Sequence, residues 1–159
     1  MKKIYLILFL FCGVAISNAQ NANIKTAESN VSISDEAQVL QKCLDFPGIQ
    51  QYFPKDADGS FLQANILQVP TAFNPSIEVT KFDQPINFMG RSFVSNHEAD
   101  AFLIFKEFTV VEAKASVVFD LFYNYKTTPA AYTVTVELIK SGADWNYASK
   151  SMTELTITN

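Results

Sequence analysis

Alternation of apolar and polar residues is strongest in the last third of the chain and predicts β-strands there. Lys114–Tyr125 and Tyr132–Leu138 each place apolar side chains at every second position. This period of two puts those side chains on one face of a strand. Phe102–Val111 is apolar on both faces, which predicts a central strand, and a final strand begins at Trp145.

The connections between these strands are short and predict an antiparallel order. They fall at residues 112–113, 126–131 and 141–144, whereas a parallel crossover needs about a dozen residues or more. Upstream the alternation is weaker, and three shorter strands are predicted at Phe61–Val69, Ile77–Phe82 and Ile86–Phe88. Residues 90–100 show no such period and are predicted to form a loop.

Helical spacing precedes the strands. Ser34 offers an N-cap hydroxyl, and the two acids that follow it suit the first turn of a helix. Apolar residues then recur on one helical face, at Ala37, Leu40, Cys43 and Leu44. Pro47 fits the first position of a second short helix, which Pro54 ends. Two kinked helical pieces are therefore predicted.

These elements together predict an α+β fold class. The N-terminal kinked helix is expected to pack on a curved antiparallel sheet of about five to six strands, because one apolar face of such a sheet must be covered. Residues 34–159 are expected to form this single domain. Residues 20–33 are polar and without a period, and are predicted to be a flexible leader.

The first 19 residues have the pattern of a cleavable secretory signal peptide. Two lysines are followed by the apolar run Ile4–Ile16, and Ser17-Asn18-Ala19 offers small residues before a cut. The apolar run is shorter than the ~20 residues of a membrane-spanning helix, although an uncleaved anchor remains the alternative. Cys12 follows the bulky Phe11, unlike a lipoprotein cysteine. The protein is expected to be exported, to the periplasm or outside the cell.

Charge and cysteine content narrow the classes of partner. Loss of Lys2 and Lys3 with the signal lowers the basic count from 12 to 10, against 16 acids. This acidic balance argues against nucleic acid as a partner. It also argues against electrostatic binding to an anionic membrane surface after signal cleavage. Cys43 would be the remaining cysteine, so no intramolecular disulfide is expected and the hydrophobic core must stabilise the fold.

Candidate metal ligands are sparse. His97 is the single histidine of the sequence, so a zinc site is not predicted, and residues 97–100 are expected to be a solvated loop. Asp56-Ala57-Asp58-Gly59 is similar to part of a calcium loop. Pro54 and Asn65 stand where that loop has its first acid and its bidentate glutamate, so an ordinary turn is predicted. No metal and no cofactor are expected.

Candidate catalytic groups are equally few. A Cys43–His97 pair is the one nucleophile and base that the sequence leaves open, while the helical face predicts that Cys43 acts as a small hydrophobe. Asp120 and Glu137 fall on the outward faces of their strands and are expected to be exposed to solvent. The aromatic residues are expected to pack in the core, with a minority lining a pocket between helix and sheet.

Two stretches resemble known proteins. Asp45–Phe53, followed by an acidic glycine turn and a strand, is similar to the N-terminal unit of small exported Bacteroidetes proteins of unknown function. Val134–Leu138, the turn at Gly142 and Trp145 resemble the closing hairpin of cystatin-like and nuclear transport factor-like α+β domains. The resemblance implies a helical segment wrapped by a curved antiparallel sheet, and it implies no activity and no functional residues. Cystatin-type inhibition is not expected, because the Gln-x-Val-x-Gly loop is missing.

The expected function is that of an exported, non-catalytic binding or interaction domain that uses a pocket or a sheet face. Its partner would be an unknown protein or small-molecule ligand. One alternative is a small nuclear transport factor-like enzyme with an acid/base pair in a pocket between helix and sheet. Another is a structural component of the envelope. No catalytic or ligand-binding residue is predicted.

Overall fold

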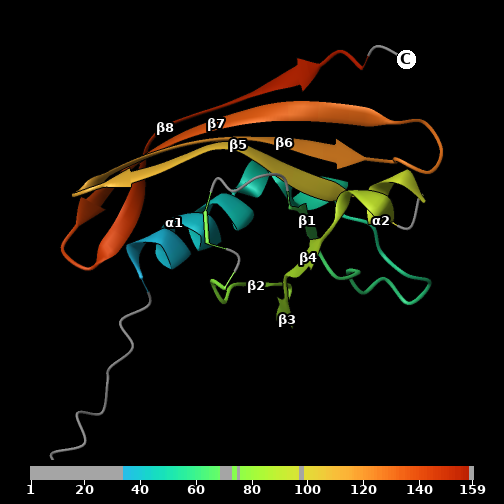
Figure 1. Ribbon diagram of the computed structural model, residues 1–159, viewed down its shortest axis with the longest axis horizontal. Coiled ribbons are helices and arrows are strands. Elements are labelled where there is room, and N and C mark those ends of the chain that lie inside the picture. Colours follow the sequence, from blue (N-terminus) through green and yellow to red (C-terminus); the bar gives the residue numbers. More distant parts are fainter. Residues whose placement is uncertain (1–33, 69–72, 75, 97–98, 158–159) are drawn as a thin grey trace, which may run out of the picture. The chain divides into compact units, whose positions relative to one another are not determined.

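The computed structural model describes residues 34–157 except 69–72, 75 and 97–98 (Figure 1). The predicted signal peptide at residues 1–19 and the predicted leader at residues 20–33 lie outside the described residues. His97 also lies outside them.

A six-stranded sheet dominates the described residues, with the strand order β4-β1-β5-β6-β7-β8. Its strands are β1 (Asn65–Leu67), β4 (Asn87–Met89), β5 (Phe102–Val111), β6 (Lys114–Tyr123), β7 (Ala130–Ser141) and β8 (Asp144–Leu155). The four strands β5 to β8 are antiparallel neighbours, which confirms the prediction from the short connections. In contrast, β1 runs parallel to both β4 and β5.

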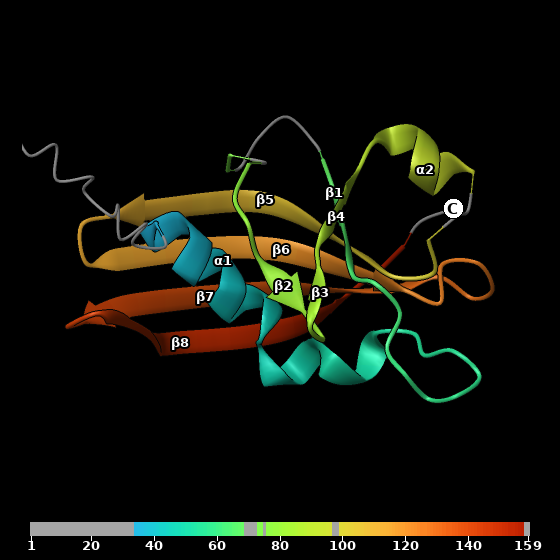
Figure 2. The same ribbon diagram turned by 90° about the horizontal axis from the view of Figure 1, so that it is seen from below.

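The remaining elements are short. Strands β2 (Thr80–Lys81) and β3 (Gln84–Pro85) form a separate hairpin. The helices are α1 (Asp35–Leu44), the 3-10 helix η1 (Pro47–Tyr52) and α2 (Arg91–Ser95). Figure 2 shows α1, η1 and the β2–β3 hairpin on the same side of the sheet.

The predicted α+β class, with an N-terminal kinked helix on a curved antiparallel sheet of about five to six strands, is wrong. Strands account for 49% of the described residues and helices for 17%, so this part of the chain is mainly a β-structure. The sheet is also mixed instead of antiparallel. Long connections from β1 to β4 and from β4 to β5 make parallel pairing possible, whereas the weak alternation upstream of β5 gave no sign of it.

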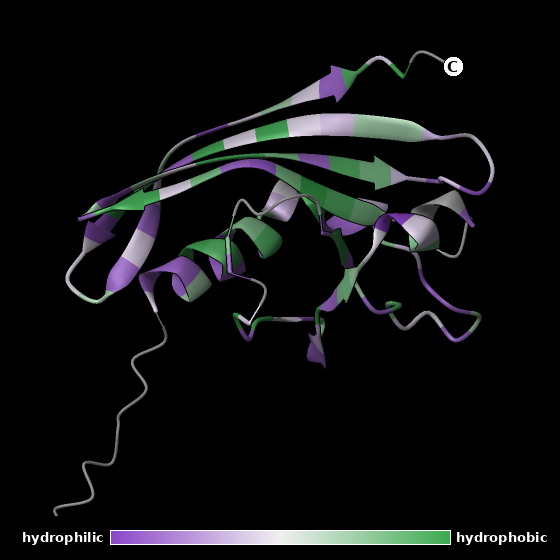
Figure 3. Cartoon of the chain, in the orientation of Figure 1, coloured by the Kyte–Doolittle hydropathy of each residue, from purple (hydrophilic) through white to green (hydrophobic). Residues whose placement is uncertain are grey.

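Helix α1 begins where the sequence predicts. The Ser34 hydroxyl accepts a hydrogen bond from the Ala37 backbone N–H at 3.2 Å, and the buried face carries Ala37, Leu40, Cys43 and Leu44, together with Val39. We call the sheet face beneath α1 the inner face. It contributes the fully buried side chains Val117, Phe119, Leu121, Val134 and Val136 to the same core cluster as α1. Figure 3 shows hydrophobic residues concentrated along β5 and β6.

The opposite, outer face of the sheet is covered only at one end by described elements. There Phe93 of α2 packs against a small cluster of Leu67, Met89, Ala99 and Phe102. The loop predicted for residues 90–100 is therefore wrong, because a five-residue helix is too short to show a period and forms through this contact. Figures 1 and 2 show no described helix or strand over the outer face of β7 and β8.

The three weaker strand predictions agree with the structure only in part. In the described part of the predicted strand Phe61–Val69, the strand is limited to the three residues of β1, and Phe61 instead makes an isolated bridge with Lys55. Ile77–Phe82 shortens to β2, since Phe82 and Asp83 have positive φ angles of 54° and 60° and form the hairpin turn. A bulky residue such as phenylalanine is uncommon in that conformation.

Candidate functional site

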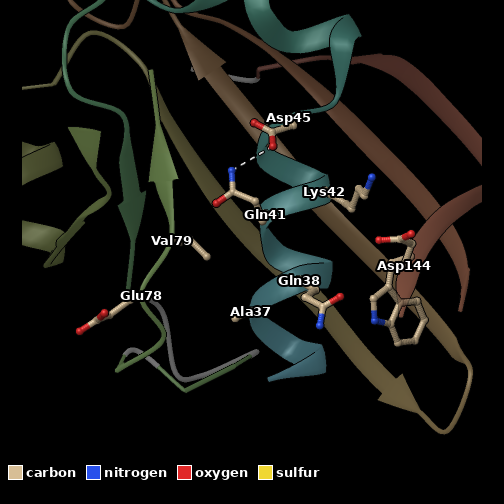
Figure 4. Close-up of a pocket in the computed structure, with 9 residues that line it drawn as sticks. Ala37, Gln38, Gln41, Lys42, Asp45, Glu78, Val79 and Asp144 are labelled. Atoms are coloured by element: carbon tan, nitrogen blue, oxygen red, sulfur yellow. Dashed lines mark hydrogen bonds between the residues drawn. The ribbon is translucent and has the colours of Figure 1, made fainter. Parts of the chain in front are cut away.

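A groove of about 310 Å³ crosses α1 and is the first candidate site for a small ligand. It is lined by Ala37, Gln38, Gln41, Lys42, Asp45, Glu78, Val79, Asp144 and Trp145. Figure 4 shows Glu78 and Val79 on one side of α1 and Asp144 on the other. The groove therefore runs across the exposed side of the helix, and it is not the aromatic-lined pocket between helix and sheet that the sequence suggested.

The central polar group of this groove serves the fold. Gln41 donates to the Thr80 carbonyl at 2.9 Å and to Asp45 Oδ2 at 3.0 Å, and its own oxygen accepts from the Thr80 N–H at 3.1 Å. The side-chain amide thus pairs with strand β2 as a neighbouring strand would. These contacts join the β2–β3 hairpin to α1 and leave Gln41 little capacity for a ligand.

The end of the groove at Trp145 is also internally bonded. The buried indole donates from Nε1 to Asp35 Oδ1 at 3.2 Å, and Lys140 Nζ lies 2.6 Å from the same oxygen. The hydrogen bond from Lys140, followed by that from Trp145, lowers the pKa of Asp35. Asp35 therefore stays ionised and links the start of α1 to the β7–β8 hairpin.

The sequence-based metal candidates do not form a site in the described residues. No group of three or more His, Cys, Asp or Glu side chains among them is arranged to hold a metal ion. Asp56-Ala57-Asp58-Gly59 is a turn, as predicted. Asp56 Oδ1 accepts from the Asp58 and Ser60 backbone N–H groups, at 3.2 and 3.0 Å, so this carboxylate is occupied with its own loop.

Cys43, the proposed nucleophile of the Cys43–His97 pair, is fully buried on the inner side of α1. Burial raises the pKa of its thiol to about 12. A reactive cysteine needs an accessible and electropositive setting that favours the thiolate. The surroundings of Cys43 therefore suit a core residue, and the position of His97 relative to it lies outside the described residues.

The buried thiol predicts a dependence of stability on pH. Below pH 9 the thiol is protonated in both the folded and the unfolded chain, so its contribution is fully present. Above pH 9 only the unfolded chain ionises, and stability should fall, by up to about 1.4 kcal/mol per pH unit, until the folded thiol ionises at about pH 12. Urea unfolding of the wild type and of Cys43→Ala checks this, because the variant lacks the part of the decline that the thiol causes. The half-buried Tyr147, whose pKa burial raises to about 12, lowers stability in both proteins. Parallel profiles above pH 9 would contradict it.

Asp120 differs from its prediction. It lies on the outer face as expected, but it is only 7% exposed. Its Oδ1 accepts from Thr133 Oγ1 at 2.7 Å and lies 2.7 Å from Lys106 Nζ, which belongs to β5. The exposed lysine stem and the threonine on the next strand shield the carboxylate. Strand alternation gives the face of a residue, and cross-strand neighbours decide its exposure.

Glu137, also predicted to be exposed, is half-buried. It accepts a hydrogen bond from Ser116 Oγ at 2.8 Å across the β6–β7 ladder. The outer face thus carries hydrogen-bonded polar pairs that span neighbouring strands. Such pairs stabilise the register of the sheet.

Lys81 is a buried charged residue that sequence reasoning missed. It is 4% exposed, and its ammonium donates to the Leu44 carbonyl at 2.6 Å and to Gln50 Oε1 at 2.5 Å. Nζ also lies 4.7 Å from the centroid of the Phe82 ring, which stacks on Phe61. The cation joins the β2–β3 hairpin to the end of α1 and to η1. No sequence signal marks it, because a lysine next to a turn is usually solvated.

The free edge of β8 is the second candidate surface. β8 is a terminal strand of the sheet, and in the described residues it pairs with β7 alone. It is 12 residues long, whereas the other terminal strand, β4, has three. Typical strands have about five or six residues. Proteins usually shorten an edge strand, cover it or interrupt it with proline, and residues 144–155 contain no proline.

A bulge divides β8 into two parts. Leu138 is opposite Tyr147 and Glu137 is opposite Ser149, so Ala148 is the extra residue. From Ser149 to Leu155 the register with β7 is unbroken. We call these seven residues the edge segment. Five of them are exposed, namely Ser149, Lys150, Ser151, Thr153 and Glu154.

The side chains of the edge segment divide between the two sheet faces. Lys150 and Met152 are opposite the buried Val136 and Val134, so they lie on the inner face, together with Glu154. Ser149, Ser151 and Thr153 lie on the outer face. The inner row thus has a cation, an apolar residue and an anion at alternate positions. Lys150 Nζ lies 5.1 Å from the centroid of the Tyr147 ring and 5.6 Å from that of Phe46.

Comparisons with known proteins identify no relative of this chain: no family model, curated protein or solved structure matches it. Among the described residues, none of the helices has the length and apolar character needed to cross a bilayer.

Proposed function

We propose that this chain is an exported, non-catalytic interaction domain whose binding surface is the free edge of β8. The observation that carries the proposal is the edge segment Ser149–Leu155, which is regular, exposed and paired on one side only in the described residues. Alternate residues of an edge strand direct their N–H and C=O groups away from the sheet. A second polypeptide strand satisfies these groups by adding to the sheet.

The other candidate surface supports a binding role less well. In the groove across α1, Gln41, Asp45 and the indole of Trp145 are hydrogen-bonded within the fold. Binding sites for small ligands usually present polar groups that converge on the ligand. The edge of β8 presents main-chain groups instead, which suit a peptide strand. Export is supported by the signal-like pattern of residues 1–19.

Site-specific photo-crosslinking in the native cells tests the proposal. Ser151→benzoylphenylalanine places the crosslinker on the edge strand, and Thr135→benzoylphenylalanine is the matched control, since Thr135 is the partner of Ser151 on the covered strand β7. Both side chains lie on the outer face, and they differ in their distance from the edge and in exposure, since Ser151 is exposed and Thr135 is half-buried.

We expect a discrete adduct from position 151 and little or none from position 135. Lys150→Pro should remove the adduct, because proline at the centre of the edge removes an N–H and disturbs the strand. Equal adducts from both positions would assign binding to the outer face and contradict the edge proposal. Absence of adducts from both positions would also contradict it.

A further inference from the structure

The partner strand that the edge segment fits best is a second copy of itself. We infer that two copies of this chain associate through β8 in an antiparallel, two-fold pairing centred on Met152, with Lys150 of each copy opposite Glu154 of the other. This inference rests on the proposed function, which it extends by naming the partner.

Symmetry limits the registers that two copies can adopt. An antiparallel pair of identical strands in one sheet is related by a two-fold axis perpendicular to the sheet, so directly opposite residues lie on the same face. Each allowed register is therefore centred on one residue, and every residue before that centre is opposite the residue equally far after it. The inner row Lys150, Met152 and Glu154 is thus matched against its own reverse.

Among the registers centred on residues 150 to 154, only one places each of the two charges opposite a charge of the other sign. Centring on Met152 places Lys150 opposite Glu154 twice and Met152 opposite itself, while Ser151 meets Thr153 on the outer face. Centring on Lys150 or Glu154 brings like charges directly opposite, which is destabilising. Centring on Ser151 places Lys150 opposite Met152, and centring on Thr153 places Glu154 opposite Met152. Both leave the charges without opposite partners.

The same charges explain how a long exposed edge avoids indiscriminate pairing. A lysine in the middle of an edge strand disfavours an uncharged partner strand. It favours a partner strand that has an acid opposite this lysine and, four residues before that acid in its own sequence, a base. Lys150 and Glu154 have this spacing within the edge segment itself. The charges that protect the edge from other strands therefore select a second copy.

Lys150 is well placed for such a contact. Its ammonium lies near the rings of Tyr147 and Phe46, which hold the side chain on the inner face. No ion pair is found for Lys150 or Glu154 among the described residues. Pairing through β8 would join the two six-stranded sheets into one continuous sheet across the dimer, and it would remove the exposed edge from both copies.

Sedimentation equilibrium of the exported chain, with a charge-reversal cycle, tests the inference. The wild type should show a concentration-dependent monomer–dimer equilibrium. Lys150→Glu and Glu154→Lys should each weaken the dimer by about tenfold or more, because symmetry turns two attractive cross-strand pairs into repulsive ones. The double variant K150E/E154K should restore the dimer.

Matched controls carry the same charge changes on other strands of the sheet. Lys114→Glu on β6 and Glu107→Lys on β5 are exposed and should leave the dimer unchanged. Equal circular dichroism and melting temperatures for all variants would show that the fold is retained. A monomeric wild type over the whole concentration range would overturn the inference, as would a double variant no better than the single ones. If the wild type is monomeric while Ser151 still crosslinks to a different protein, the edge proposal stands and only the second copy is wrong.

Discussion

Trp145→Ala is expected to lower the free energy of unfolding by about 3–5 kcal/mol, the largest effect of any single change considered. Trp145 is fully buried at the start of β8, in the same core cluster as α1. Alanine would leave a large cavity and would also remove the hydrogen bond from Nε1 to Asp35. The first turn of α1 would then lose a link to the β7–β8 hairpin, while Lys140 would still contact Asp35. Urea-induced unfolding followed by circular dichroism measures the loss.

Trp145→Phe is the matched control for this prediction. It keeps most of the buried ring and removes the indole N–H, so we expect a loss of about 1–2 kcal/mol. A loss below about 1 kcal/mol for Trp145→Ala would contradict the close packing of this corner of the core. Similar losses for alanine and phenylalanine would assign the effect to the hydrogen bond instead of the ring.

Lys81→Ala is expected to cost about 2–4 kcal/mol, even though it removes a buried charge. The ammonium donates to the Leu44 carbonyl at the end of α1 and to Gln50 in η1. Removing it leaves polar oxygens in the interior with one donor fewer. Burial lowers the pKa of Lys81, and the charge of the neighbouring Asp45 opposes that shift. The cost of desolvating the ammonium therefore offsets part of what its hydrogen bonds contribute.

Lys81→Met distinguishes the contribution of the ammonium to stability from that of the apolar part of the side chain. Methionine keeps most of the apolar length and the contact with Phe82, so its loss should be about 1–3 kcal/mol and smaller than that of alanine. Unfolding curves in urea for both variants check the order. A methionine variant at least as stable as the wild type would contradict this prediction, because it would show that the hydrogen bonds of Lys81 do not exceed its desolvation cost.

The elements with strong local signals were predictable from the sequence. The apolar character of both faces of Phe102–Val111, the alternation of Lys114–Tyr125 and the short connections predict β5, β6 and their antiparallel pairing. Ser34 and the helical spacing that follows it predict α1. Each of these signals depends on residues close together in the chain, where period and capping determine structure.

The predictions that failed concern features that depend on contacts between residues far apart in the chain. The parallel pairing of Ile66 with Leu103 has no local signature, and it turned a predicted antiparallel sheet into a mixed one. Asp120 is buried because Lys106 and Thr133 reach it from two other strands. The edge position of β8 is likewise set by the strand order of the whole sheet, so the candidate surface could not be identified from its alternation alone.

The free edge of β8 is proposed to receive another strand, and the ratio of photo-adducts from positions 151 and 135 measures this most directly. The two residues are partners in the β7–β8 ladder and share the outer face, so they differ in their distance from the edge. We expect an adduct that depends on position 151 and disappears with Lys150→Pro. Equal yields at the two positions, or no adduct at either, would contradict the proposed binding edge.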